Sequence, residues 1–167
     1  MAYTNKIYVA FDADNDIRYY RLMQAWKQSD HTSFNFYDAH DLNNLMPYST
    51  EETIRAKLRD RLLNTKLFIL LVGENTKYLY KFVKWEIEQA IKREIPIIVV
   101  NLNGKRSKDS SLCPTVLNNH LVLHLSFKQK IIEKAINEWP ALHASYKSKN
   151  EIDDYFYKES IYTNLGL

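Results

Sequence analysis

The chain has 167 residues, a length that suits one domain built around a single hydrophobic core. Apolar residues make up 46% of it and charged residues 26%, a balance typical of folded proteins and not of disordered ones. The formal net charge of +3 is too small for the basic stripe of a nucleic-acid binder, and a single cysteine excludes an internal disulfide or a cysteine-rich zinc site.

The amino-terminal residues carry no signal for export. Residues 1–5 lead directly into an expected strand, without a basic segment followed by an apolar one. Nowhere does the sequence contain a run of 18 apolar residues, the minimum that a membrane-spanning helix needs. We therefore expect a cytoplasmic protein that does not contact a membrane.

The first half of the chain alternates between strand and helix patterns. Short apolar runs predict strands at 6–11 and 34–37, and helical spacing of apolar residues predicts helices at 17–27 and 51–63. Asn15 or Asp16 is suited to cap the first helix, and Ser49 or Thr50 the second. A long polar loop is expected between them at 38–49.

The second half continues the alternation. Strands are expected at 67–72, 96–101 and 121–125, with helices at 79–93 and 127–138. The first two of these strands are apolar on both faces, which is typical of central strands covered by helices. Strands and helices that alternate in this way predict an α/β domain with a five-stranded parallel sheet and helices on both faces.

The remaining residues, 139–167, are rich in tyrosine and lysine. We expect them to form a carboxy-terminal extension with one helix around 152–161, packed on the outside of the sheet. The predicted organisation is thus a domain at 1–138 and an extension at 139–167 that belongs to the same unit.

Ligands of open parallel sheets bind beyond the carboxyl ends of the strands. No GxGxxG or GxxxxGK[ST] motif is present, so binding of phosphates by a glycine-rich loop is disfavoured. Asp12, Asp14 and Asp16 follow the first strand, as in phosphate-accepting receiver domains, but the third strand leads to Glu74 and not to an acceptor aspartate. We therefore interpret these aspartates as helix caps, and we expect no metal site.

Glu86 lies on the predicted helix at 79–93, at the border of its apolar stripe, whereas Glu88 points toward water. Partial burial of a carboxylate strengthens its interactions and shifts its pKa, which is typical of functional sites. The structural alternative is that Glu86 forms an ion pair with Lys81, Arg93 or a neighbouring helix, and the pattern alone leaves that alternative open.

Three segments in this order resemble the bacterial Toll/interleukin-1 receptor (TIR)-like proteins of Thoeris anti-phage systems. They are Lys6-Ile-Tyr-Val-Ala-Phe-Asp12, Phe36-Tyr-Asp-Ala39, and Leu70-Leu-Val-Gly-Glu-Asn-Thr76 leading to Phe82-Val-Lys-Trp-Glu-Ile87. The resemblance covers roughly residues 6–103. It implies a flavodoxin-like three-layer sandwich, and for many members it implies cleavage of NAD at the bond between nicotinamide and ribose.

By the same resemblance, Glu86 is the key catalytic residue. We expect the substrate-binding residues to be Phe11, Asp12, Asp38, Lys81, Phe82 and Trp85. NAD would be the substrate, no separate cofactor is implied, and we expect His40 to be a solvated loop residue and not a general base. A carboxylate near the ribose would stabilise the positive charge that develops there as nicotinamide leaves.

The resemblance further implies a role in antiviral signalling. The product would be a cyclic or linear derivative of ADP-ribose that acts on a separate effector protein, and the loop at 38–49 would join copies of the domain into a homo-oligomer. Two other functions stay open from the sequence: a non-catalytic TIR module that acts by assembly, and a nucleotide sensor without turnover.

Overall fold

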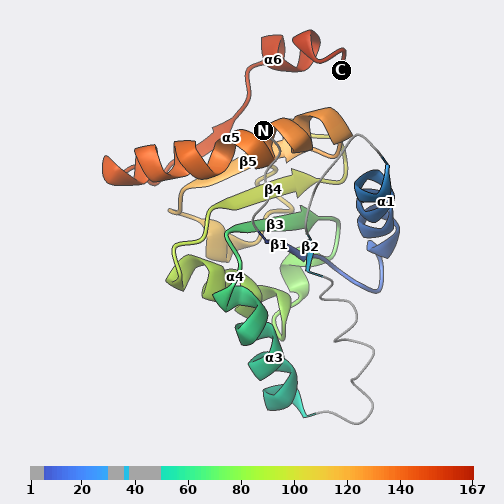
Figure 1. Cartoon of the computed structure of the whole chain (residues 1–167), viewed down its shortest axis with the longest axis vertical. Coiled ribbons are helices and arrows are strands. Elements are labelled where there is room, and N and C mark those ends of the chain that lie inside the picture. The colour runs from blue at the N-terminus through green and yellow to red at the C-terminus, as the bar shows by residue number, and fades with distance from the viewer. Residues whose placement is uncertain (1–5, 30–35, 38–49) are drawn as a thin grey trace.

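The computed structural model describes residues 6–29, 36–37 and 50–167. Its centre is a sheet of six parallel strands in the order β2-β1-β3-β4-β5-β6 (Figure 1). The strands are β1 (Ile7–Ala10), β2 (Phe36–Tyr37), β3 (Leu67–Val72), β4 (Ile97–Asn101), β5 (Val122–Ser126) and β6 (Asp154–Phe156). This confirms the α/β class and the five predicted parallel strands, to which β6 adds a sixth.

Helices cover both faces of this sheet. The α-helices are α1 (Ile17–Gln28), α3 (Glu51–Leu63), α4 (Val83–Lys92), α5 (Gln129–Ser148) and α6 (Glu159–Asn164), and two short 3₁₀ helices are η2 (Thr76–Tyr78) and η3 (Thr115–Leu117). Buried residues of α1 and α5 pack on one face, and those of α3, α4 and η3 pack on the other. The result is the three-layer sandwich that the resemblance implied.

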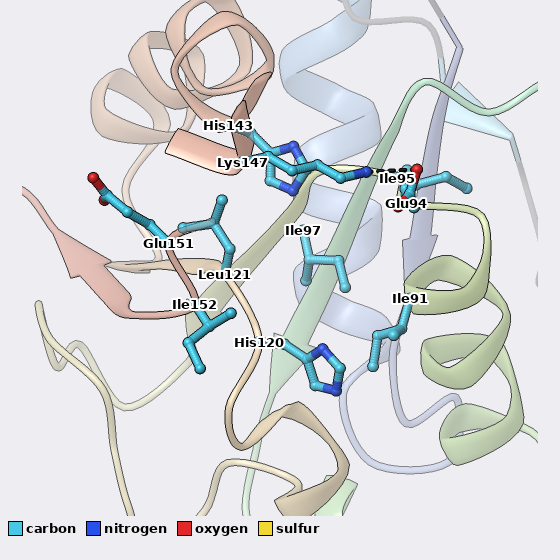
Figure 2. Close-up of a pocket in the computed structure, with 10 residues that line it drawn as sticks. All are labelled: Ile91, Glu94, Ile95, Ile97, His120, Leu121, His143, Lys147, Glu151 and Ile152. Atoms are coloured by element: carbon cyan, nitrogen blue, oxygen red, sulfur yellow. Dashed lines mark ion pairs between the residues drawn. The ribbon is translucent and has the colours of Figure 1, made fainter. Parts of the chain in front are cut away.

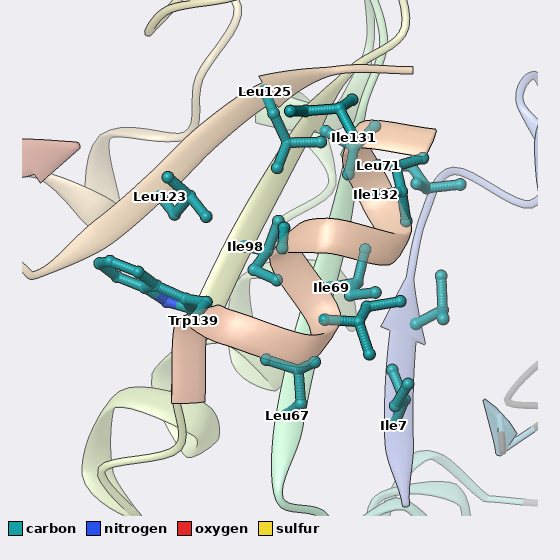
Figure 3. Close-up of a cluster of buried hydrophobic side chains, with 14 of the residues drawn as sticks. Ile7, Leu67, Ile69, Leu71, Ile98, Leu123, Leu125, Ile131, Ile132 and Trp139 are labelled. Carbon is teal, nitrogen blue, oxygen red and sulfur yellow. The ribbon is translucent and has the colours of Figure 1, made fainter. Parts of the chain in front are cut away.

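The two halves of the core follow from the alternation of side chains along each strand. Ile7, Leu67, Ile69 and Leu71 point to the face covered by α1 and α5 (Figure 3). Their neighbours in the strands, such as Phe68 and Leu70, point to the face covered by α3 and α4. Because both faces are apolar, β3 and β4 are buried along their full length.

The predicted helix at 79–93 is wrong at its start, because α4 begins only at Val83. Residues 76–78 form the 3₁₀ helix η2, and Leu79 then leaves helical geometry, with φ −89° and ψ 77°. At α3, by contrast, the bounds agree with the prediction, and the Thr50 side chain accepts a hydrogen bond from the Thr53 N–H at 3.2 Å. The start of α3 is thus fixed by a side-chain cap, whereas α4 begins later than predicted because a 3₁₀ turn precedes it.

The end of the chain differs most from the prediction. Helix α5 runs ten residues beyond Glu138, through Pro140, because Trp139 and His143 continue its buried stripe. The helix predicted at 152–161 is wrong, since β6 and α6 occupy this part of the chain. The extension is therefore part strand, and it lengthens the sheet at the β5 edge.

A polar contact fastens β6 to β5. His124 in β5 is fully buried, and its Nε2 lies 2.7 Å from Oδ1 of Asp154, the first residue of β6. Lys108 donates to the other carboxylate oxygen of Asp154 at 3.1 Å. Burial lowers the pKa of His124, so the neutral ring with an N–H at Nε2 is the form that suits this contact.

Candidate active site

Glu86 lies in the first turn of α4, on the side of the helix that faces the sheet. Val83, Ile87 and Ala90 form the apolar stripe of α4, and Glu86 is buried with them, with only 6% of its surface exposed. Glu88 instead points to solvent and lies 4.0 Å from Lys84. The expected contrast between the two carboxylates is confirmed, and Glu86 is more deeply buried than its border position predicted.

Burial makes Glu86 an unusually weak acid. Loss of water around the carboxylate raises its pKa to about 7, and the nearby Tyr8 hydroxyl partly offsets that rise. Tyr8 is fully buried in β1, and its own pKa is raised well above the usual value, first by burial and then by the charge of Glu86. In this structure the Tyr8 hydroxyl makes no hydrogen bond of normal geometry.

No cationic side chain pairs with Glu86 among the residues whose structure is described. Lys81, one of the expected partners, lies 3.6 Å from Glu51 instead. Arg93, the other, donates to the side-chain oxygen of Gln89 at 3.1 Å. The structural ion pair that the sequence left open is therefore absent from the described part of the chain.

Helix α3 brings two arginines against the aromatic side chain next to Glu86. The guanidinium carbons of Arg55 and Arg59 lie 5.7 and 5.9 Å from the ring centre of Trp85, within the range of cation–π attraction. Arg55 also donates to the Lys81 carbonyl at 3.0 Å. The half-buried Trp85 is thus held between α3 and α4.

Four of the predicted site residues, Lys81, Phe82, Trp85 and Glu86, are near one another because they are close in the sequence at the start of α4, and their common role in a site stays a prediction. The ammonium of Lys81 lies 5.6 Å from the ring centre of Phe82. Tyr8, Arg55 and Arg59 are additional neighbours that the sequence analysis missed. The only sequence signal for Tyr8 is the alternation of side chains along β1, and no local sequence signal points to the two arginines.

Phe11 and Asp12 lie elsewhere. The ring of Phe11 stacks on Tyr20 at 4.7 Å, in the core half covered by α1 and α5 and not in the half covered by α4. The carboxylate of Asp12 organises its own loop, where it accepts hydrogen bonds from the backbone N–H groups of Asp14 and Asn15 and from the Asn15 side chain. Their predicted role in substrate binding stays a prediction.

Asp38, together with His40 and the rest of the loop at 38–49, lies outside the described residues. In the described part of the chain, no group of three or more histidine, cysteine or acidic side chains is arranged to hold a metal ion. A membrane-crossing helix is likewise absent from that part, since none of its helices is both long and apolar enough.

Glu86 does not line any of three cavities formed by the described residues. One of them, of about 170 Å³, lies at the amino edge of the sheet, between the ends of α4 and α5 (Figure 2). Its floor is apolar, with Ile97 and Leu121, and its rim holds the ion pair of Lys147 with Glu94 at 2.6 Å. Sheets of this kind bind ligands at the carboxyl ends of their strands, and this cavity lies at the opposite edge.

The parallel sheet contains the strand order 2-1-3-4-5, which is that of flavodoxin-like domains, and a buried glutamate lies in the helix after β3. Residues 8–107, more than half of the chain, match the family described as Thoeris protein ThsB, TIR-like domain. The chain belongs to this family. Among curated proteins, none matches the sequence.

The raised pKa of Glu86 predicts that the stability of the protein depends on pH. The folded state binds the Glu86 proton more tightly than the unfolded state does. The stabilisation that results from this tighter binding is fully present below the unfolded pKa of 4.5 and is lost as the pH rises through about 7. The difference corresponds to about 3 kcal/mol. Glu86→Gln should therefore be more stable than the parent at pH 8, by an amount that vanishes near pH 4.5.

Urea unfolding of the parent and Glu86→Gln between pH 4.5 and 8 measures this effect. Glu88→Gln is the matched control, because it removes an exposed carboxylate from the same helix. Its stability should differ from that of the parent by the same small amount at every pH. A Glu86→Gln difference that does not grow with pH would contradict the burial of an ionisable carboxylate at this position.

Proposed function

We propose that this protein cleaves NAD at the bond between nicotinamide and ribose, with Glu86 as the catalytic residue. The observation that carries the proposal is a buried carboxylate in the first turn of α4, without a cationic partner in the described part of the chain, in a member of the Thoeris TIR-like family. A glutamate is ordinarily buried in order to form a structural ion pair, and within the described part of the chain Glu86 forms none.

The chemistry suits this side chain. As nicotinamide leaves, positive charge develops on the ribose, and an ionised carboxylate held beside the sugar stabilises that charge or holds the ribose hydroxyls. In a desolvated site the attraction is stronger than in water. Because the pKa of Glu86 is about 7, the reactive, ionised form increases as the pH rises through neutrality. Activity should therefore rise over the same range.

The remaining parts of the proposal follow from the family. Trp85 and Phe82 supply aromatic surface beside Glu86, and Lys81 supplies positive charge for the phosphates of the dinucleotide. The ribosyl group is then captured by water, by the adenine of the same molecule or by another acceptor, which gives a linear or cyclic derivative of ADP-ribose.

We propose that this product signals to a separate effector in the cytoplasm during anti-phage defence, and that the loop at 38–49 joins copies of the domain.

One observation favours a second function. Glu86 lines none of the three cavities described above, as would be expected of a TIR module that acts only by assembling with other TIR domains. In such a module Glu86 would be a structural residue, and the protein would associate without consuming NAD.

Incubation of the purified protein with NAD, followed by chromatography for free nicotinamide, tests the proposal. The reaction is run alone and with a lysate of phage-infected cells, because a trigger or self-assembly can be needed to complete such a site. Nicotinamide release in either condition, above that of the lysate alone, supports the enzyme. Assembly without release in both conditions supports the non-catalytic module, and saturable NAD binding without release supports a sensor.

A further inference from the structure

Tyr8 brings a polar group into the half of the core that α3 and α4 cover. Its side chain is fully buried, and it belongs to the same cluster of buried residues as Val83 and Ile87, which lie on either side of Glu86 in the sequence of α4. The Tyr8 hydroxyl is buried without a hydrogen-bond partner in this structure. A buried hydroxyl without a partner lowers the stability of the folded state, so stability does not explain why this residue is a tyrosine.

The aromatic ring of Tyr8 has a structural role that a phenylalanine would fill equally well. Tyr8 of β1 pairs with Phe68 of β3, and the two rings stack with their centres 5.5 Å apart and their planes within 9° of parallel. This stack holds the Tyr8 ring in place. Because stacking does not use the hydroxyl, the hydroxyl needs a separate explanation.

The carboxylate of Glu86 is the polar group with which this hydroxyl interacts. Burial raises the pKa of Glu86, and the Tyr8 hydroxyl lowers it, as a donor to the ionised carboxylate does. The pKa of Tyr8 is itself raised well above its usual value, first by burial and then by Glu86. The phenol therefore keeps its proton over the whole range in which Glu86 titrates, and it can donate that proton in a hydrogen bond.

The charged groups of the neighbouring helices act elsewhere. Arg61 of α3 influences Tyr8, because its charge lowers the pKa of the Tyr8 hydroxyl. Lys84, two residues before Glu86 in α4, lies 4.0 Å from Glu88 at the surface. The side chains that β3 contributes to this half of the core are apolar. Within the described residues, Tyr8 is therefore the side chain placed to donate to an ionised Glu86 from inside the core.

We propose that Tyr8 is a positioning residue for Glu86, and that its hydroxyl donates a hydrogen bond to the carboxylate once Glu86 has lost its proton. The bond would hold one carboxylate oxygen from the core side and leave the other oxygen for the ribose. Tyr8 itself does not touch the substrate. Its part in catalysis rests on the proposed cleavage of NAD, whereas its contact with Glu86 does not.

Titration of Glu86 tests this contact without NAD. In protein labelled with ¹³C at the glutamate carboxyl groups, the NMR signal that is missing from Glu86→Gln identifies Glu86, and its chemical shift follows the loss of the proton. Removal of a hydrogen bond to a charged group should make the ionised form about tenfold less favourable. The titration midpoint of Tyr8→Phe should therefore lie about one pH unit above that of the parent.

Tyr162→Phe is the matched control. It also removes a buried tyrosine hydroxyl, but from the half of the core covered by α1 and α5, where that hydroxyl accepts a hydrogen bond from the Ser126 N–H at 3.3 Å. The titration midpoint of Glu86 should be the same in Tyr162→Phe as in the parent.

The pH dependence of NAD cleavage tests the positioning role. If Tyr8 only packs, Tyr8→Phe should change the rate of nicotinamide release by the same factor at every pH. We expect instead a rate about tenfold lower than that of the parent at pH 6, where the fraction of ionised Glu86 is about tenfold smaller. This difference should shrink as the pH rises and Glu86 ionises in both proteins.

The two measurements separate this inference from the proposed function. An unshifted Glu86 midpoint in folded Tyr8→Phe overturns the contact, and a shifted midpoint with a constant ratio of rates overturns the positioning role. If the parent releases no nicotinamide, the proposed cleavage is wrong, whereas the titration still decides whether Tyr8 holds Glu86.

A parent protein made with 3-fluorotyrosine serves if Tyr8→Phe folds poorly. The fluorinated phenol is a stronger hydrogen-bond donor, so the Glu86 midpoint should fall, and an unchanged midpoint would count against the contact.

Discussion

Glu86→Gln is expected to reduce nicotinamide release from NAD by about 10²–10³-fold, the usual effect of removing one preorganised electrostatic contact to the transition state. Glutamine has nearly the same shape as glutamate but carries no negative charge, so it cannot stabilise a positively charged ribose. The loss should appear in kcat, because the charge on the sugar develops only as the bond breaks. Initial rates at several NAD concentrations measure it.

A structural role for Glu86 makes the opposite prediction for stability. If Glu86 mainly held the fold together, Glu86→Gln would lose activity through unfolding, whereas burial of an ionisable carboxylate predicts a variant that is at least as stable at pH 8. Glu88→Gln serves as the control again, and it should retain the activity of the parent. Loss of activity in a stable Glu86→Gln protein, with Glu88→Gln unaffected, separates catalysis from folding.

The second large effect is expected at Trp139, just beyond the predicted boundary of the domain. Its side chain is only 1% exposed and lies in the core half covered by α1 and α5 (Figure 3). Its ring centre lies 5.9 Å from those of His143 and Tyr155, so it joins α5 to the end of the chain. Trp139→Ala should therefore lower the free energy of unfolding by about 3–5 kcal/mol.

Two variants sharpen this test by urea unfolding. Trp139→Phe keeps most of the apolar contact and removes a buried indole N–H that has no acceptor, so it should cost much less than the alanine variant. Leu142→Ala, on the exposed side of the same helix, should cost little. If Trp139→Ala costs no more than Leu142→Ala, the extension is not part of the main core.

The elements that the sequence predicted well are those with local signals. The apolar run of β3 and the capped helix α3 agree with the structure in both bounds, because burial pattern and capping reside in a few adjacent residues. Strand β6 could not be predicted in this way. It contains only three residues, and it forms because Tyr155 and Phe156 pair with Leu123 and His124 of β5, a contact between distant segments.

The candidate site shows the same difference between local signals, which the sequence reveals, and contacts between distant segments, which it does not. Helical spacing was sufficient to place Glu86 beside the apolar stripe of α4, and its burial confirms that interpretation. The neighbours contributed by other elements were missed, since Tyr8 comes from β1 and the two arginines beside Trp85 come from α3. Likewise, the sequence suggested Asp16 as a cap of α1, but its side chain makes no capping hydrogen bond and packs against Gly73 instead.

Catalysis by Glu86 is tested most directly by comparing the parent and Glu86→Gln in one time course of NAD loss and nicotinamide formation, with and without infected-cell lysate. We expect one nicotinamide for each NAD consumed by the parent, and a rate lower by at least about 10²-fold for a folded Glu86→Gln. Equal nicotinamide formation by the two proteins, or none by the parent in either condition, would contradict it.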